Sequence, residues 1–530
     1  MNRLKFQWVV VLVVLAGLIP AKAQLFDENL QKLQMTWRII NTFYVDTVNQ
    51  QKLTENAISG MLKSLDPHSV YISAGEVKAM NEPLDGSFEG IGIEFNILDD
   101  TLMVVNPISG GPSEKVGIMA GDRIVSVDGD NVAGVGLKNS DVFRLLRGAK
   151  GTAVLLGIHR RSEKDILSFL VERDKIPIFS VNAAYMATPK IGYIRISRFA
   201  ITTNDEFKKA MRKLEDEGVK DLILDLRGNG GGYLKAAIDI ADEFLGNKKL
   251  IVYTEGITSA KKEHYSTNRG LSENGKLIVM IDEGSASASE IVSGAIQDWD
   301  RGVILGRRSF GKGLVQRPFS LPDGSIIRLT IAKYYTPSGR CIQKDYTHGI
   351  DAYHMEVYDR MKDGELFSKD SVRMSDSLVY KTKVLHRTVY GGGGIMPDVY
   401  VPMDTSMYSD YYRNVVAKGI LNRFVLNYVD ENRDALESKY TNFADFNREF
   451  IVDKPLMSKL ISAAEKAGVK MNEEEYIKSE KHLSIQMKAL IARDLWSTSE
   501  YFEVVNPLNK EYLNAIELMG NKSEYLKLLK

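Results

Sequence analysis

Between about residues 176 and 343, short apolar runs alternate with amphipathic segments, and this alternation constrains the fold more than any other feature. The run from Asp221 to Leu226 is almost continuously apolar, which is typical of a strand buried in a sheet. One amphipathic segment follows an expected N-cap at Asn204 and carries three apolar side chains on one helical face: Phe207, Met211 and Leu214. The alternation predicts an α/β domain with a mostly buried sheet.

The chain has 530 residues, too many for one hydrophobic core, so several domains are expected. Residues 24–84 are expected to form a helical N-terminal region, with helical periodicity from Glu28 to about Leu65. Residues 85–175 form short β runs between glycine-rich turns, and residues 404–530 are helical and charged. The α/β domain then occupies residues 176–403, with a polar insertion at about 344–390. The expected fold is multidomain, combining α/β and α+β parts.

Residues 1–23 have the three parts of a secretory signal peptide. Arg3 and Lys5 give a positive start, an apolar run extends from Trp8 to Ile19, and Ala21-Lys22-Ala23 fits the small-x-small cleavage pattern. The run is shorter than the roughly 20 apolar residues of a membrane span. We therefore expect an exported protein of the periplasm or cell envelope, which is membrane-associated if the apolar segment stays uncleaved.

The amino-acid composition disfavours several classes of function. Lys+Arg and Asp+Glu both number 69, so the charge balance gives no indication of a nucleic-acid partner. Cys341 is the only cysteine, which leaves no internal disulfide, and we interpret it as a small buried residue. The seven histidines form no HExxH motif and no metal-ligand spacing, so neither a metal, a cofactor nor a histidine-dependent triad is expected.

A cluster of small residues from Gly284 to Glu290 lies between a predicted strand and a predicted helix that begins near Ser287. Such a turn exposes a serine hydroxyl at a helix N-terminus, where free N–H groups can stabilise a developing oxyanion. The alternative interpretation is that these serines only cap the helix.

The segment from Gly306 to Gly313 nearly matches a phosphate-binding loop. Position 313 is glycine, so the hydroxyl that binds magnesium is absent, which disfavours a nucleotide-binding enzyme. Lys312 is instead a candidate base, because burial lowers the pKa of an amine. The alternative is a solvated surface lysine. A second loop, Gly228 to Gly232, does not meet the dinucleotide pattern, but it could direct a backbone N–H at the nucleophile.

Together these segments resemble the C-terminal processing peptidases, also called tail-specific proteases, from about residue 30 to 402. The resemblance is carried by the following motifs: Leu65-Asp66-Pro67-His68-Ser69, Gly90-Ile91-Gly92-Ile93, Asp225-Leu226-Arg227 with its glycines, Gly284 to Glu290, and Phe310-Gly311-Lys312-Gly313-Leu314-Val315-Gln316. It implies a serine endopeptidase with a core of the ClpP/crotonase-like type.

The family uses a Ser–Lys dyad in which the lysine follows the serine by 25 residues, which selects Ser287 as nucleophile and Lys312 as base. Its glutamine four residues beyond the lysine, which orients the amine, is Gln316 here. The resemblance places the oxyanion hole at the N–H groups of Ala288 and of one glycine in the 228–232 loop, and we favour Gly231.

The domain at 85–175 resembles a PDZ module, which binds an extended peptide as an added strand. The loop of Gly90, Ile91, Gly92 and Ile93 would hold the terminal carboxylate, and Arg147 would couple the module to the core. The implied partners are proteins or peptides with unstructured C-terminal tails, and the resemblance leaves a homo-oligomer and an activating adaptor open. The competing hypothesis is a non-catalytic peptide-binding scaffold with a relic core.

Overall fold

The computed structural model describes residues 28–374, 377–406 and 408–529, so the predicted signal peptide at residues 1–23 lies outside the described residues. The chain divides into two compact units, Met1–Leu65 and Asp66–Lys530. The first unit contains helices α2 (Glu28–Phe43) and α3 (Gln50–Lys63). Asn49 caps α3 by accepting a hydrogen bond from the N–H of Lys52. None of the described helices is long and apolar enough to cross a membrane.

Residues 66–84, which the sequence pattern groups with the N-terminal helices, belong to the second unit. They form strand β1 (Val70–Ile72), which pairs with a strand of the core, and helix α4 (Ala74–Asp85). Ser73 and Glu76 form a capping box at the start of α4, which explains why the chain turns into a helix directly after β1.

The central sheet of the core has six strands in the order β10-β11-β12-β15-β16-β21. The pair β10–β11 is antiparallel and the other pairs are parallel. The strands are β10 (Val181–Met186), β11 (Ile191–Ile196), β12 (Asp221–Asp225), β15 (Leu277–Ile281), β16 (Val303–Gly306) and β21 (Val399–Tyr400). All five residues of β15 are buried, and this confirms the predicted α/β core with a buried sheet.

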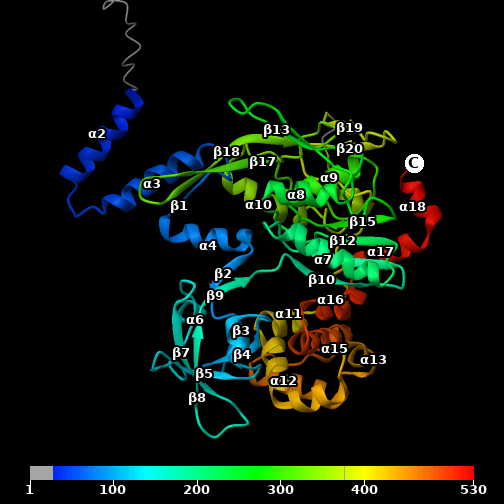
Figure 1. The fold of residues 1–530 in the computed structure, drawn as a ribbon. Helices are drawn as coiled ribbons and strands as arrows, with labels where there is room; N and C mark the ends of the chain where they lie inside the picture. Colours follow the sequence, from blue (N-terminus) through cyan, green and yellow to red (C-terminus); the bar gives the residue numbers. More distant parts are fainter. Residues whose placement is uncertain (1–27, 375–376, 407, 530) are drawn as a thin grey trace, which may run out of the picture. The chain divides into compact units, whose positions relative to one another are not determined.

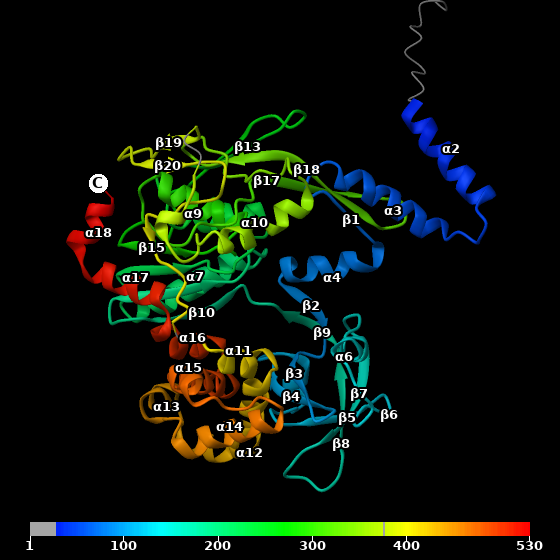
Figure 2. The same cartoon turned by 180° about the vertical axis from the view of Figure 1, so that it is seen from behind.

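Helices cover both faces of this sheet. One face packs against α7 (Thr203–Asp216), α8 (Leu234–Asp242) and α9 (Ala288–Asp298), and the other packs against α17 (Lys510–Gly520) and α18 (Lys522–Leu528). In Figures 1 and 2, α7 and the red helices α17 and α18 can be followed beside the sheet. The predicted N-cap at Asn204 is wrong, because α7 starts one residue earlier and Thr202 is its N-cap. Two helices from the C-terminal region are thus part of the core.

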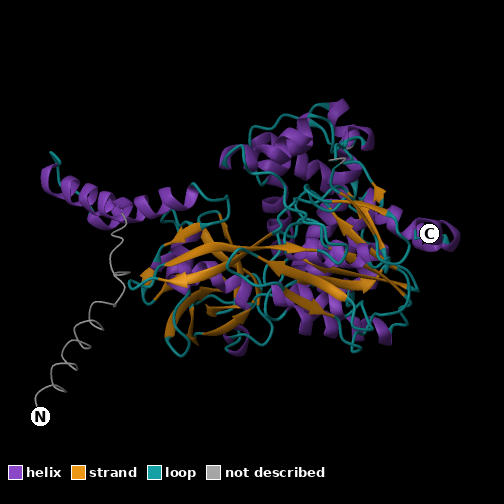
Figure 3. Cartoon of the chain, turned by 90° about the horizontal axis from the view of Figure 1, so that it is seen from above, coloured by secondary structure: helices purple, strands orange, loops and turns teal. Residues whose placement is uncertain are grey.

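A second sheet has the order β1-β18-β13-β14, with β17 paired to β18. Its further strands are β13 (Leu250–Glu255), β14 (Lys262–Tyr265), β17 (Leu314–Ser320) and β18 (Ile326–Tyr335). The sequence did not indicate β17 because Pro318 lies within it, and proline is confined to edge strands. In this sheet β17 is such an edge, since it pairs with β18 alone among the described strands. Figure 3 distinguishes the strands of these sheets from the helices by colour.

The smaller β domain contains the sheet β3-β4-β5-β7-β8, with β6 paired to β5, and a separate pair β2–β9. The expected loop at Gly90 to Ile93 joins β2 to β3, and Gly92, with a φ of +75°, turns the chain between these strands. The elements are β2 (Ser87–Gly90), β3 (Ile93–Leu98), β4 (Thr101–Pro107), α5 (Pro112–Lys115), β5 (Arg123–Val127), β6 (Asp130–Asn131), α6 (Asn139–Leu146), β7 (Ala153–His159), β8 (Leu167–Glu172) and β9 (Asp174–Pro177).

The insertion at 344–390 contains α10 (Ile350–Lys362), a 3-10 turn η1 (Lys369–Ser371) and the hairpin strands β19 (Val379–Lys381) and β20 (Thr388–Tyr390). The C-terminal region is helical, as predicted, and most of it has a hydrophobic core of its own. Its further elements are α11 (Asp410–Ala417), α12 (Ile420–Lys439), α13 (Phe443–Glu449), α14 (Lys454–Lys466), α15 (Glu473–Leu495), α16 (Thr498–Val505) and the 3-10 turn η2 (Asn506–Leu508).

Candidate active site

Ser287 lies at the N-cap of the buried helix α9, in the turn that follows β15. Its φ of +54° and ψ of −109° are unusual for a residue with a side chain, and such a conformation costs about 1–3 kcal/mol. Two hydrogen bonds to the segment after β12 fix the turn. Ser285 Oγ donates to the carbonyl oxygen of Leu226 at 2.8 Å, and the N–H of Ala286 donates to the carbonyl oxygen of Asn229 at 3.0 Å. The strain is therefore held at the one serine whose position matches the predicted nucleophile.

Glu290, one turn into α9, joins the segments of the predicted nucleophile and base. Its carboxylate accepts hydrogen bonds from the N–H of Ser287 at 2.8 Å and from the N–H of Lys312 at 2.8 Å. It also accepts from the N–H of Gly311 and from Ser309 Oγ. Burial raises the pKa of Glu290 to about 7. The sequence analysis did not identify this role, although Ser287-Ala288-Ser289-Glu290 has the S-x-x-E spacing of a capping box.

The buried hydroxyl of Tyr334 makes a second link between the same two segments. It lies 2.6 Å from the carbonyl oxygen of Lys312 and 3.1 Å from that of Ser287. Burial also raises the pKa of Tyr334, so this side chain stays a neutral hydrogen-bond donor. The backbones of Ser287 and Lys312, 25 residues apart in sequence, are thus held together at two points.

Lys312 has the electrostatic environment of a base. Its pKa is lowered to about 8, chiefly by burial and secondarily by the positive charge of Arg328, whereas Glu290 and Asp66 act in the opposite direction. Among the described residues, no hydrogen bond joins Lys312 Nζ to Ser287 Oγ. The structure therefore brings the two segments together and leaves the hydroxyl and the amine unbonded.

Gln316 lies in β17 and is held by the Leu65–Ser69 motif rather than by Lys312. Its Nε2 donates to Thr330 Oγ1 at 3.2 Å, and Thr330 Oγ1 donates to Asp66 Oδ1 at 2.9 Å. No hydrogen bond from Gln316 to Lys312 occurs within the described part of the chain. Asp66 also accepts from Ser69 Oγ at 2.5 Å, so the motif forms a compact turn against β18. The sequence analysis quoted this motif without assigning it a role.

His68, in the same turn, is a neutral imidazole. Burial and the nearby Lys312 lower its pKa to about 3. Its Nε2 lies 2.8 Å from the hydroxyl of Tyr353, which belongs to α10 of the insertion. The insertion therefore contacts His68, which lies close enough to Lys312 to be affected by its charge.

Two backbone N–H groups next to Ser287 are available for an oxyanion. The N–H of Ala288, the first residue of α9, has no acceptor among the described residues. Gly231 also lies at the nucleophile, since a Cβ there would come within 2.9 Å of the Cβ of Ser287. Its own N–H, however, donates to Asn229 Oδ1 at 2.9 Å, which differs from the predicted role. The next glycine, Gly232, has an N–H for which the described structure shows no acceptor.

A pocket with mostly apolar walls opens beside Ser287, Ala288 and Gly232. Its walls come from α8, α9, β17 and β18, and they include Tyr233, Leu234, Ile291, Leu314, Val315, Ile331 and Tyr334. The arrangement suits an apolar side chain placed next to a serine hydroxyl.

The predicted peptide-binding loop lines a second groove, in the β domain. Gly90, Ile91, Gly92 and Ile93 lie on one side of this groove, and α6 contributes Val142, Phe143 and Leu146 on the other. Strand β3 is an edge of its sheet, so its outer side can pair with an added strand. Arg147 lies at the end of the groove, stacks on Phe88 and Phe143, and forms an ion pair of 2.6 Å with Glu82 of α4.

Models of known domain families match four parts of the chain. Residues 190–352 match peptidase family S41, residues 103–160 match a PDZ domain, and residues 19–75 match the N-terminal domain of the activating protease CtpB. Residues 411–497 match a family of unknown function. The first three matches confirm the predicted protease core, PDZ domain and helical N-terminal region.

Two curated relatives are named carboxy-terminal processing proteases. The chain is 38% identical over 335 residues to the carboxy-terminal processing protease CtpB of Bacillus subtilis, covering 62% of this chain and 68% of the relative. It is 41% identical over 309 residues to a carboxy-terminal-processing protease of Bartonella bacilliformis, covering 57% and 70% respectively. Among solved structures, the photosystem II D1 C-terminal processing protease aligns with 30% identity over 58% of this chain and 89% of its own, with a TM-score of 0.34. The sequence relatives and the S41 match show that the chain belongs to the carboxy-terminal processing serine proteases.

Proposed function

We propose that the chain cleaves exported proteins in their C-terminal regions, with Ser287 as nucleophile and Lys312 as general base. The observation that supports this most strongly is the buried amine of Lys312, whose backbone is tied to that of Ser287 through Glu290. A lysine with a pKa near 8 is partly neutral at physiological pH, as a base must be.

In the proposed mechanism, neutral Lys312 Nζ takes the proton of Ser287 Oγ as this oxygen attacks the peptide carbonyl carbon. The N–H groups of Ala288 and Gly232 stabilise the oxyanion, and one such donor is worth about 3 kcal/mol in related hydrolases. The Lys312 ammonium then protonates the leaving amine, and the peptide C–N bond breaks. Water hydrolyses the acyl-enzyme and restores the serine.

Approach of Lys312 Nζ to Ser287 Oγ is required before the first step. Gln316 donates to Thr330, which in turn donates to Asp66, so its amide would have to turn away from Thr330 to orient the amine. We propose that this alignment accompanies substrate binding.

Substrate recruitment is assigned to the PDZ domain. The edge strand β3 and the groove along α6 suit an extended apolar tail, with the Gly90–Ile93 loop receiving its carboxylate. Arg147 at the end of the groove contacts α4, which precedes the domain, and it would transmit occupancy of the groove toward the core.

Export rests on the signal-peptide pattern of residues 1–23, and we propose the periplasm or cell envelope as the location. Mass spectrometry of the N-terminus of protein recovered from the envelope fraction tests this. A mature N-terminus at Gln24 supports export with cleavage, and a retained Met1 in a soluble cytoplasmic fraction contradicts it.

The catalytic assignment is tested by incubating the wild type, Ser287→Ala and Lys312→Ala with a disordered protein that has an apolar tail. The matched control is Lys333→Ala, which removes an exposed lysine of β18. Cleavage by the wild type and the control, and none by the two site variants, is expected; full activity of either site variant contradicts the dyad. If the enzyme recognises the C-terminal carboxylate of the tail, the same substrate with an amidated C-terminus should be cleaved more slowly than the unmodified substrate. Tail binding without turnover by the wild type would favour the scaffold hypothesis.

A further inference from the structure

The start of helix α17 contacts two arginines that stand at the bases of the two catalytic loops. We propose that Asn509 and Glu511 are positioning residues that hold the glycine loop 228–232 and the lysine loop 306–313 in register. This gives the C-terminal region a role in catalysis, and it rests on the function proposed above.

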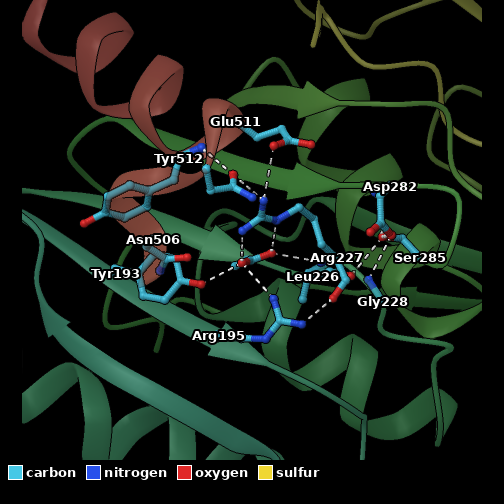
Figure 4. A network of polar contacts seen from close by, with 12 residues as sticks. Tyr193, Arg195, Leu226, Arg227, Gly228, Asp282, Ser285, Asn506, Glu511 and Tyr512 are labelled. Atoms are coloured by element: carbon cyan, nitrogen blue, oxygen red, sulfur yellow. Dashed lines mark hydrogen bonds and ion pairs between the residues drawn. The ribbon is translucent and has the colours of Figure 1, made fainter. Parts of the chain in front are cut away.

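The first contact is made by Arg227, which immediately precedes the glycine loop. Its Nη1 donates to Asn509 Oδ1 at 2.6 Å and lies 3.6 Å from Glu511. The same guanidinium makes two hydrogen bonds to Asp225, of 3.0 and 2.7 Å. Figure 4 shows Arg227 between Glu511 and the central sheet. These contacts fix the position of the guanidinium group. They thereby restrain the residue that immediately precedes the glycine loop.

The backbone around Arg227 is held as firmly as its side chain. Its carbonyl accepts from Arg195 Nη2 at 2.9 Å, and the next residue, Gly228, donates its N–H to Asp282 Oδ1 at 2.8 Å. Asn229 then accepts from the N–H of Ala286, which adjoins the nucleophile. A displacement of Arg227 would thus pass along the loop backbone to Gly232, and through the hydrogen bond between Asn229 and Ala286 to the neighbouring Ser287.

The second contact is made by Arg307, at the start of the lysine loop. Its Nη1 donates to Glu511 Oε1, and its Nε donates to Glu283 at 2.8 Å. Two residues later Ser309 bonds to Glu290, which also receives the N–H of Lys312. Glu511 therefore lies between the guanidinium groups that anchor both loops.

The network is largely buried, and each of its charged groups has an oppositely charged partner. Three guanidinium groups, of Arg195, Arg227 and Arg307, face three carboxylates, of Asp225, Glu283 and Glu511. The side chains of Glu511 and Arg227 are each 10% exposed. Removing one charge from such a network leaves its partner buried and uncompensated, so its members fix one arrangement rather than several.

Helix α17 cannot follow a shifted arginine, because it is itself packed on the core. Asn509 caps it by accepting from the N–H of Tyr512 at 3.0 Å. Tyr512, Ala515 and Met519 are buried against the central sheet. The helix therefore acts as a fixed support for both arginines.

The experiment compares Asn509→Ala with Asn509→Asp, because aspartate keeps both the helix cap and the acceptor for Arg227. Glu511→Gln removes the shared charge, and Glu517→Gln, an exposed residue of the same helix, is the control. Each variant is assayed for kcat and KM per titrated active site, for tail-peptide affinity and for thermal unfolding. Hydrogen exchange of peptides spanning 226–233 and 306–313 is measured in the Ser287→Ala background.

Displacement of a catalytic group by about 1 Å lowers the rate on the order of a hundredfold. Asn509→Ala and Glu511→Gln should therefore lower kcat about 10- to 100-fold, with KM and tail affinity within about twofold of the wild type. Both loops should exchange faster, while Asn509→Asp and Glu517→Gln behave as the wild type.

The proposal is overturned if kcat per active site and loop exchange stay unchanged while only the unfolding temperature falls. It is also overturned if Asn509→Asp loses as much activity as Asn509→Ala. If Asn509→Ala does not fold, the proposal is tested with Glu511→Gln alone, by its kcat per active site and by the hydrogen exchange of the two loops. Loop exchange does not depend on turnover, so a failure of the Ser–Lys assignment, seen as an active Ser287→Ala, remains distinguishable.

Discussion

At the scale of single residues, the neighbourhood of Lys312 determines the pH at which its amine becomes neutral. Arg328 contributes to this, since its charge is the second largest cause of the lowered pKa. Arg328 forms no ion pair with any described residue, its Nε lacks a partner, and its Nη1 contacts Met80 Sδ at 3.8 Å. Its positive charge therefore acts on Lys312 without a carboxylate to offset it.

A pH profile follows from these contacts. Because the neutral amine is the active form, kcat/KM should rise as the pH increases through about 8 and should be about a hundredfold below its maximum at pH 6. Arg328→Gln removes a repelling charge, so the pKa of Lys312 should rise and the profile should move by about half a unit or more to higher pH. Stopped-time assays from pH 6 to 10 measure this.

Lys333→Gln removes an exposed charge from the same strand and serves as the control for this profile. An unchanged midpoint in Arg328→Gln would show that burial alone sets the pKa. A profile that falls between pH 6 and 8 would contradict Lys312 as the base.

How far the site could be predicted from sequence differs among its residues. The family spacing selected Ser287 and Lys312 as candidates, and in the structure Glu290 joins their backbones. Glu290 was detectable as a capping box, but its bonds to the lysine loop join residues more than 20 positions apart. The choice between Gly231 and Gly232 depends on which N–H Asn229 occupies, and a run of glycines has no pattern that reveals this.

At the scale of elements, α4 connects three functional parts. Glu82 forms an ion pair with Arg147 at the proposed peptide groove, and Asp85 accepts a hydrogen bond from the hydroxyl of Tyr233 in the pocket beside Ser287. Met80 contacts Arg328. The sequence analysis assigned residues 66–84 to the N-terminal region without identifying this helix, since the helical periodicity that it used ends near Leu65. Strand β1 escaped detection for a similar reason, because three residues are too few for a period to emerge.

Glu82→Gln should uncouple tail binding from cleavage. The side chain of Glu82 is 11% exposed, so its loss leaves Arg147 without its fixed partner, while the groove residues stay in place. We expect tail-peptide affinity within about threefold of the wild type, and an advantage of tailed over tailless substrate reduced about tenfold. Fluorescence anisotropy and paired cleavage assays give the two values.

The control for Glu82→Gln is Glu89→Gln, which breaks an ion pair with Lys78 whose lysine side chain is 64% exposed. Pairs of this kind contribute little, so this variant should behave as the wild type. If Glu82→Gln still cleaves the tailed substrate faster than the tailless substrate by the same factor as the wild type, α4 does not couple tail binding to cleavage.

At the scale of the whole second unit, the PDZ domain is attached to the C-terminal helices as well as to α4. Asp430 of α12 accepts from Arg123 and from Arg161, each at 2.9 Å. Leu98 and Met103 pack against Leu426 beside these ion pairs. No sequence pattern could indicate this interface, because each side of it is a single charge or apolar residue on an ordinary amphipathic element.

Asp430→Ala should loosen this attachment. Two arginines lose their partner, and an interface weakened by about 1 kcal/mol opens about fivefold more often. Hydrogen exchange of residues 98–105 should accelerate by that factor, with the unfolding of the core unchanged. Asp434→Ala, an exposed acid one turn further along α12, should have no effect. Equal exchange in both variants would show that the apolar contacts alone hold the interface.

The packing of α17 and α18 on the second face of the central sheet has a consequence for biosynthesis. Tyr193, Ile223 and Met280 are covered by residues that the ribosome adds more than 200 positions later. Until those residues emerge, the strands that carry the nucleophile turn expose an apolar face and both anchoring arginines lack Glu511. A nascent chain with its first 500 residues complete therefore lacks the helices that cover this face. On the roles proposed above, we expect proteolysis to begin only after these helices have been synthesised.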